Sequence, residues 1–211
     1  MTTEIEDAIR SFYKHRLKEF GATAKGVDYP NQQRHWISFS QIVKIFERET
    51  SLFSVLDFGC GYGELISYLR QTQISQPWFP LLRYTGVDLS PEMIERANFM
   101  NGNFGQFHVG TEVSSTFDYV VVNGTLNLRL GTSIEDWTDY CLQTLKRLKK
   151  HCTRGLVVTL LSNVRDSFEP GDRVYYADPP EWLNLCLEHL SKKVAILHDY
   201  GVPEFALLLR F

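Results

Sequence analysis

The stretch Asp57-Phe58-Gly59-Cys60-Gly61-Tyr62-Gly63 decides the fold, and Asp88 is its counterpart further along the chain. An apolar run at residues 53–58 leads into the glycines, and a helical pattern follows them. Glycines at the end of a buried strand let the backbone approach a ligand closely and adopt positive φ angles. The start of the next helix offers unpaired N–H groups to polar ligand atoms. The pattern therefore predicts a ligand-binding turn rather than a turn that is glycine-rich by chance.

The acidic residues indicate what kind of ligand the turn binds. A pyrophosphate-binding loop has the form Gly-x-Gly-x-x-Gly, whereas Asp57 here precedes Gly-x-Gly-x-Gly. A carboxylate repels a diphosphate but attracts an ammonium group. Asp88 ends the next predicted strand, where a carboxylate accepts hydrogen bonds from both ribose hydroxyls. The alternative, in which Asp88 only caps the following helix, is weaker because Ser90 fills that role better. The sequence predicts a nucleoside that carries a positive charge.

The chain from residue 52 onward alternates short apolar runs with amphipathic helices. This alternation is typical of a mostly parallel sheet with helices on both faces. The last two runs are joined by a gap too short for a crossover helix, so they should form an antiparallel hairpin. The predicted strands are residues 53–58, 83–89, 106–109, 117–122, 155–161, 193–198 and 205–211, and the main helices are 64–70, 134–150, 180–190 and one capped by Ser90.

The first fifty residues differ from the rest. Apolar residues recur at helical spacing before Gly21 and again from Trp36 to Phe46, with a polar loop between them. We expect residues 1–50 to form a helical cover over a core of residues 51–211, the whole being one domain.

Composition excludes several classes of protein. The 211 residues carry a net charge of −3, which argues against a protein that grips a phosphate backbone. No apolar run approaches the roughly 18 residues of a membrane span, and the four cysteines form no C-x-x-C pair. We expect a cytoplasmic protein with reduced thiols, no metal site, and neither a nucleic acid nor a membrane as partner.

Two longer stretches carry a resemblance to a known family. They are Ser54-Val55-Leu56-Asp57-Phe58-Gly59-Cys60-Gly61-Tyr62-Gly63 and Tyr84-Thr85-Gly86-Val87-Asp88-Leu89-Ser90-Pro91-Glu92-Met93-Ile94. Together they resemble class I S-adenosylmethionine-dependent methyltransferases, as do the run 117–124 and the terminal hairpin. The resemblance covers roughly residues 50 to 211 and suggests a bacterial enzyme of the small-molecule type. It implies a Rossmann-like sheet of seven strands.

The resemblance also implies site residues. Asp57, Gly59 and Gly61 would contact the methionine part of S-adenosylmethionine, Asp88 the ribose, and Asn123 with Gly124 the sulfonium end. Many relatives place an Asp after the third strand to bind the adenine edge, whereas this chain has Val109-Gly110-Thr111-Glu112, so Thr111 or Glu112 would substitute. Leu89 would face the adenine plane or join the core. The predicted cofactor set is completed by Cys60, Gly63 and Met93.

The acceptor should bind among the loops that follow the strands and the helical cover. Candidate contacts, each with a structural role as its alternative, are Tyr13, Tyr29, Trp36, Asn127, Arg129 and Arg165. The candidate general base is His198, at the end of the sixth strand, with His35 as the weaker choice. A structural histidine is the alternative at both positions.

The function predicted from these residues is transfer of a methyl group from S-adenosylmethionine to an oxygen or nitrogen of a small molecule, which leaves S-adenosylhomocysteine. A catalytically silent S-adenosylmethionine-binding module that regulates or scaffolds a partner is the alternative from another class. A nicotinamide-dependent dehydrogenase is a third reading. It requires the Gly-x-Gly-x-x-Gly loop that this chain lacks.

Overall fold

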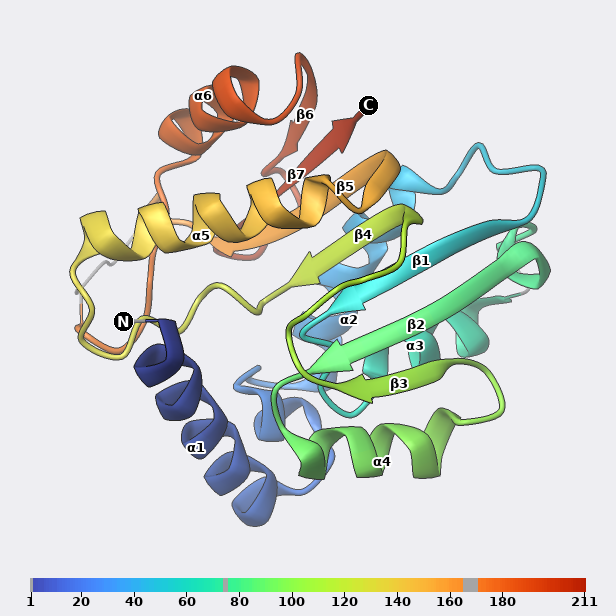
Figure 1. The fold of residues 1–211 in the computed structure, drawn as a ribbon, viewed down its shortest axis with the longest axis horizontal. Coiled ribbons are helices and arrows are strands. Elements are labelled where there is room, and N and C mark those ends of the chain that lie inside the picture. Colours follow the sequence, from blue (N-terminus) through green and yellow to red (C-terminus); the bar gives the residue numbers. More distant parts are fainter. Residues whose placement is uncertain (1, 74–75, 165–170) are drawn as a thin grey trace.

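The computed structural model describes residues 2–73, 76–164 and 171–211, and its centre is one seven-stranded sheet. The strand order is β3-β2-β1-β4-β5-β7-β6 (Figure 1). The strands are β1 (Phe53–Phe58), β2 (Leu82–Asp88), β3 (Gln106–Val109), β4 (Phe117–Asn123), β5 (Cys152–Leu161), β6 (Lys193–Leu197) and β7 (Glu204–Arg210). The helices are α1 (Thr2–Phe20), α2 (Gln32–Ile42), α3 (Glu64–Thr72), α4 (Pro91–Asn101), α5 (Ile134–Lys149) and α6 (Pro179–His189), with short 3-10 helices η1 (Ala24–Val27), η2 (Val43–Ile45) and η4 (Phe79–Leu81).

Strand direction confirms the expected mixed sheet. β1 pairs in parallel with both β2 and β4, and β2–β3 and β4–β5 are parallel as well. β7 runs antiparallel to β5 and to β6, because the six residues between β6 and β7 allow only a hairpin. The order of the strands reverses between β1 and β4, which opens a crevice at their carboxyl ends.

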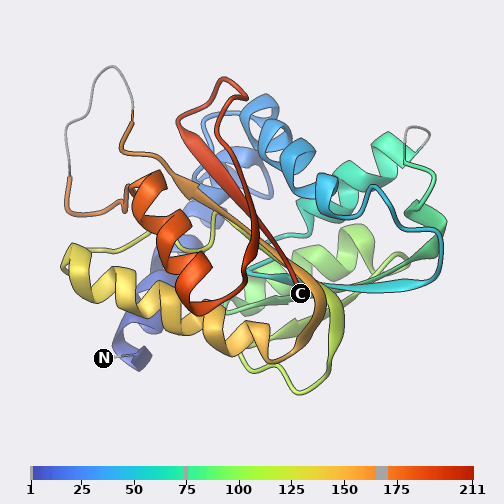
Figure 2. The same cartoon turned by 90° about the horizontal axis from the view of Figure 1, so that it is seen from above.

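Alternate residues of the central strands enter two separate cores. Leu56 of β1 and Val120 of β4 face the side covered by α5 and α6, where Trp137 and Trp182 are fully buried. Val55 and Val121, their neighbours along the same strands, face the side covered by α2, α3 and α4. Figure 2 shows the helices on both faces of the sheet. The side-chain period of two in each strand thus supplies both layers.

The helices α4 and α6 each begin with a capping side chain that is followed by a proline. The Ser90 hydroxyl accepts a hydrogen bond from the Met93 N–H at 3.3 Å, and Pro91 occupies the first turn of α4. α6 begins in the same way, at Pro179 after the Asp178 cap, one residue earlier than expected. No helix among the described residues is both long and apolar enough to cross a membrane.

The two N-terminal helices contact different parts of the structure. α2 packs against β4, β5 and β7, whereas α1 contacts η1 and α4. In Figure 1 the arrowheads of β1 to β3 point toward the end of the sheet beside α1. The N-terminal segment therefore covers the edge where the strands finish.

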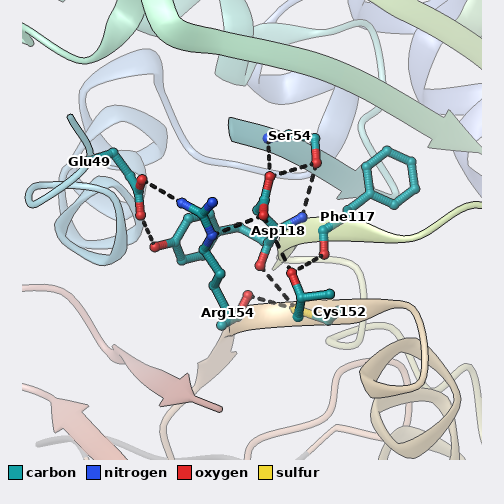
Figure 3. A network of polar contacts seen from close by, with 9 residues as sticks. Glu49, Ser54, Phe117, Asp118, Cys152 and Arg154 are labelled. Carbon is teal, nitrogen blue, oxygen red and sulfur yellow. Dashed lines mark hydrogen bonds and ion pairs between the residues drawn. The ribbon is translucent and has the colours of Figure 1, made fainter. Parts of the chain in front are cut away.

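The opposite edge of the sheet holds a network of polar side chains (Figure 3). One oxygen of Asp118 accepts hydrogen bonds from the backbone N–H and the hydroxyl of Ser54, at 2.8 and 3.0 Å. Arg154 bridges Asp118 at 2.9 Å and Glu49 at 2.7 Å. These contacts tie the starts of β1, β4 and β5 together, which explains why β5 begins at Cys152 rather than at the expected Gly155.

Candidate active site

A cavity opens at the carboxyl ends of β1, β2 and β4, where the strand order reverses. Its wall combines loops of the sheet with residues from α1, α2 and the segment between them. The sequence-predicted residues that line it are Asp57, Gly59, Cys60, Gly61, Asp88, Leu89, Met93, Thr111, Asn123, Gly124, Tyr13, Tyr29 and the weaker candidate base His35. The structure thus brings ten of the twelve predicted cofactor residues to one wall.

The loop after β1 is held against β2 by its backbone. The N–H groups of Gly59 and Cys60 both donate to the Val87 carbonyl, at 2.8 and 3.0 Å. Gly59 has φ +77°, and a Cβ there would lie 2.3 Å from the Thr125 hydroxyl oxygen. Only glycine fits between the loop and the residues that follow β4.

Asp88 accepts hydrogen bonds from two backbone N–H groups. Gly61 donates to one carboxyl oxygen and Ser90 to the other, each at 2.9 Å. Burial raises the pKa of Asp88, and these two hydrogen bonds oppose the shift. Each carboxylate oxygen has a second lone pair, so the group retains acceptor capacity for hydroxyl groups of a ligand.

Asp57 is more deeply buried than Asp88, and its exposed fraction is 3%. Burial raises its pKa to about 7; the hydrogen bond donated by the Tyr84 hydroxyl lowers it, and the charge of Asp88 raises it further. The carboxylate of Asp57 therefore changes its charge close to neutral pH.

The tip of β4 meets the N-terminal cover. The Thr159 hydroxyl donates to the Asn123 side-chain oxygen at 2.8 Å, which leaves the Asn123 amide to donate to the Tyr29 hydroxyl at 3.2 Å. Gly124 has φ +69°, and a Cβ there would lie 3.0 Å from the same hydroxyl. The Tyr29 hydroxyl is therefore in direct contact with the residues at the end of β4, and both line the cavity.

Aromatic rings form the cover side of the cavity. Tyr29 stacks on His35 with ring centroids 4.0 Å apart, and Phe39 packs on the other side of His35 at 4.3 Å. Burial lowers the pKa of His35 to about 3, so its ring is neutral, and its Nδ1 has no hydrogen-bond partner among the described residues. This part of the wall therefore suits an aromatic group of a ligand that carries little charge.

Two predicted cofactor residues lie outside the cavity wall. Gly63 begins α3 with φ +80°, and a Cβ there would lie 3.1 Å from Asn101, so it is needed for packing against α4. Glu112 is exposed, whereas its neighbour Thr111 lines the cavity. The Thr111 carbonyl is fixed by Arg147, which donates to it at 2.7 Å.

Several predicted acceptor contacts have structural partners instead. Arg129 donates to the carbonyls of Val174, Thr132 and Gly171. The Asn127 side chain accepts from the Leu161 N–H at 3.1 Å.

The Trp36 indole donates to Glu64 at 3.1 Å and does not line the cavity. Arg165 lies outside the described residues.

His198, the candidate base, is exposed beyond the end of edge strand β6 and packs on Phe205 at 5.9 Å. It does not line the cavity, because β5 and β7 separate β6 from β4. Its position gives no support for a role in proton transfer.

Other residues of the wall were not predicted from the sequence. Arg10 of α1 lines the cavity and donates to the Leu89 carbonyl at 3.2 Å. Its spacing of three from Tyr13 places both on one helix face, a signal that the sequence contained. Thr125, Leu126 and Tyr140 also contribute, and no local pattern marks them.

A sheet of this order with its cavity at the β1–β4 crevice defines the class I, S-adenosylmethionine-dependent methyltransferase fold. Residues 9–191 match the family model described as a methyltransferase domain. The chain belongs to this family and is a methyltransferase.

Three similar proteins agree with this assignment. Rv1506c of Mycobacterium tuberculosis, which carries a methyltransferase name, is 36% identical over 160 residues, 75% of this chain and 93% of that protein. The magnesium protoporphyrin IX methyltransferase of Synechocystis PCC 6803, solved with bound SAH (S-adenosylhomocysteine), is 15% identical. The match covers 100% of this chain and 99% of that one, with a TM-score of 0.66. The DhpI–SAH complex is 16% identical and covers 97% and 95%, with a TM-score of 0.63. The two solved structures show that the fold is shared.

Proposed function

We propose that this chain transfers the methyl group of S-adenosylmethionine to an oxygen or nitrogen of a small molecule, and that residues 1–50 cover the core of one methyltransferase domain. The observation that carries the proposal is the division of the cavity wall. Two carboxylates, Asp57 and Asp88, lie on the sheet side, and a set of stacked rings faces them from the cover. One side suits a cationic nucleoside and the other a compact acceptor.

The residues of the sheet side fit the cofactor. Asp88 retains acceptor capacity for ribose hydroxyls, and Asp57 would attract the α-ammonium group. The backbone of Gly59 and Gly61, both at positive φ, packs so closely that an added Cβ would meet Thr125 and Val27, respectively, so the turn keeps its shape only with glycine. Leu89 and Met93 would contact the adenine plane, and Thr111 its edge.

The cofactor supplies an activated methyl group, so the protein needs mainly to align an acceptor for in-line displacement. Asn123 and Gly124 would border the sulfonium end, directly beside the Tyr29 hydroxyl. Tyr13, Tyr29, His35 and Phe39 would position the acceptor and exclude water.

Radiolabelled transfer tests this proposal. The protein is incubated with methyl-labelled S-adenosylmethionine and, separately, a pool of small hydroxyl and amine compounds, total RNA, or total protein. We expect label in the small-molecule pool. Label confined to the RNA or protein pool would contradict the acceptor class, and binding of S-adenosylmethionine without transfer to any pool would favour a silent binding module.

Gly124→Ala tests the alignment of the acceptor separately from cofactor binding. The new Cβ would crowd the Tyr29 hydroxyl, so we expect methyl transfer to fall by about tenfold or more while affinity for S-adenosylhomocysteine changes little. Gly131→Ala is the matched control, since Gly131 has φ +86° with no atom within 4 Å of the added Cβ and lies outside the cavity wall. Equal losses in both variants would show that backbone strain, rather than crowding of the acceptor, is responsible.

A further inference from the structure

Glu204 is a buried carboxyl group that the proposed function does not use. It is the first residue of β7 and is 3% exposed, next to the cavity wall but not part of it. The Ser38 hydroxyl donates to it at 2.5 Å and the Tyr200 hydroxyl at 3.2 Å. Among the described residues it has no ion-pair partner, and a buried carboxylate without one is costly.

A series of polar groups connects Glu204 with the cavity. Tyr29 lines the cavity and accepts the hydrogen bond of the Asn123 amide at 3.2 Å. Burial raises the pKa of both Tyr29 and Glu204; hydrogen bonding with Ser38 opposes the shift at Tyr29, and hydrogen bonding from Ser38 and Tyr29 opposes it at Glu204, so the three side chains lie close together. Hydroxyl groups therefore run from the end of β4 to the carboxyl group.

The titratable groups around Glu204 change their charge at different pH values. Burial raises the pKa of Glu204 to about 7, against hydrogen bonds from Ser38, Tyr200 and Tyr29 and the attraction of Arg34. Burial also raises the pKa of Tyr29 well above 10, and burial together with the charge of Glu204 raises the pKa of Tyr200. His35, stacked on Tyr29, stays neutral because burial lowers its pKa to about 3.

We propose that Glu204 is a positioning residue that stores the proton lost by a neutral acceptor hydroxyl, which reaches it through Tyr29 and Ser38. This inference rests on the proposed function. As the acceptor oxygen bonds the methyl carbon, the C–S bond breaks and its electron pair stays on sulfur. The hydroxyl proton passes to Tyr29, the proton of Tyr29 to Ser38, and that of Ser38 to the Glu204 carboxylate. Atoms and charge balance without any other reactant.

The same arrangement indicates the class of acceptor. A carboxylate acceptor has no proton to lose and needs a cation in the wall. Arg10 is the one permanent cation among the described residues that line the cavity, and it is bound to Asp7 and the Leu89 carbonyl. An uncharged, phenol-type hydroxyl on a flat ring fits beside the rings of His35 and Phe39.

The test compares Glu204→Gln with Glu49→Gln. Glu49 also accepts a hydrogen bond from a tyrosine hydroxyl, that of Tyr119, but lies at the opposite edge of the sheet (Figure 3). Catechol and benzoate serve as probe acceptors from about pH 5.5 to about pH 9. The rates are measured at saturating S-adenosylmethionine, which removes the effect of Asp57 on cofactor affinity. We expect wild-type protein and Glu49→Gln to methylate catechol with a rate that rises through an apparent pKa near 7, whereas Glu204→Gln has a flat profile and a rate about 100-fold lower at high pH.

A second measurement needs no turnover. Because Asp57 also titrates near pH 7, the comparison is made in an Asp57→Asn background. Infrared spectroscopy should detect a protonated carboxyl band that titrates near pH 7 in Asp57→Asn and in Asp57→Asn/Tyr29→Phe but is missing in Asp57→Asn/Glu204→Gln. Tyr29→Phe should nevertheless lose the pH-dependent rate, because the path to Glu204 is interrupted.

Any of three results would overturn the proposal: an unchanged pH profile in Glu204→Gln, no such band, or benzoate methylated in preference to catechol. Methylation of neither probe by protein that binds S-adenosylhomocysteine would overturn the acceptor class. Failure to bind S-adenosylhomocysteine would instead contradict the proposed function.

Discussion

The two acidic residues of the cavity are held in different ways. Asp88 is fixed by two backbone N–H groups, whereas Asp57 is buried and accepts a hydrogen bond from the Tyr84 hydroxyl. A carboxyl group fixed by backbone donors suits permanent recognition of hydroxyl groups. One that is mainly desolvated responds to pH and to a nearby cation.

Cofactor affinity should depend on the charge of Asp57. Its pKa is raised to about 7, first by burial, so the carboxyl group is protonated in the free protein below that pH and charged above it. We expect the affinity for S-adenosylhomocysteine to increase as the pH rises from about 6 to about 8, by up to about tenfold per unit below the pKa. Calorimetry across this range measures it.

The control for this prediction is Asp57→Asn, which cannot change its charge and should give a weaker affinity with a flat profile. A wild-type affinity independent of pH would show that Asp57 does not interact with the ammonium group.

For single residues, the sequence predicted those of the cavity wall that lie next to glycines. It missed residues whose surroundings depend on tertiary contacts. Asp57 and Asp88 were identifiable because each ends a strand and precedes a recognisable turn. Arg129 stays a predicted acceptor contact; its carbonyl partners come from residues 132–174, which no local pattern reveals. The distance of His198 from the cavity could not be predicted, because strand order in the sheet, not position along the chain, sets it.

Among the elements, the loop between β1 and α3 is the most constrained. In Gly59→Ala the residue would keep a positive φ and its new Cβ would clash with Thr125. The Thr125 hydroxyl donates to the Phe58 carbonyl at 3.0 Å, so this side chain is not free to change its rotamer. We expect the free energy of unfolding to fall by about 3 kcal/mol, from the strain and the overpacking together. Chemical denaturation measures this change.

Gly21→Ala provides the comparison for this loop, since Gly21 has φ +66° with nothing within 4 Å of an added Cβ. It should cost about 1 kcal/mol, the backbone strain alone. Equal costs at both positions would show that Thr125 yields without penalty.

The elements themselves were well predicted because their signals are local. β1 and β3 have the expected bounds, and Ser90 caps α4 as anticipated. The start of β5 was wrong by three residues because Thr153 and Arg154 are polar and join the strand through contacts with residues near β1 and β4. η1 was not predicted at all, since a four-residue 3-10 helix has no periodic pattern.

For the whole molecule, the cover is joined to the segment before α6 by charges around Asp28. Arg173 contacts one carboxyl oxygen at 2.7 Å and Arg16 the other at 3.2 Å. Asp28 itself has φ +65° at the end of η1, close to the start of the aromatic wall. Each of these partly exposed ion pairs contributes little stability, so together they join the cover to this segment only weakly.

Asp28→Asn should therefore loosen the cover rather than unfold the protein. Because exposed ion pairs contribute only about 0.2 to 1 kcal/mol each, we expect S-adenosylhomocysteine to dissociate about two- to fivefold faster. Asn also retains the tolerance for positive φ. Stopped-flow displacement measures the rate, and Asp139→Asn, on the exposed face of α5, is the control. A dissociation rate equal to that of the control would show that the cover does not retain the cofactor.

The central claim is that the carboxyl group of Asp88 binds the ribose of the cofactor. Calorimetry with S-adenosylhomocysteine on wild-type protein, Asp88→Asn and Asp118→Asn tests it most directly, because both residues accept backbone N–H donors but lie at opposite edges of the sheet. The account predicts a loss of about 10- to 100-fold in affinity for Asp88→Asn and none for Asp118→Asn. Unchanged affinity in Asp88→Asn, or binding of NADH in place of S-adenosylhomocysteine by the wild-type protein, would contradict it.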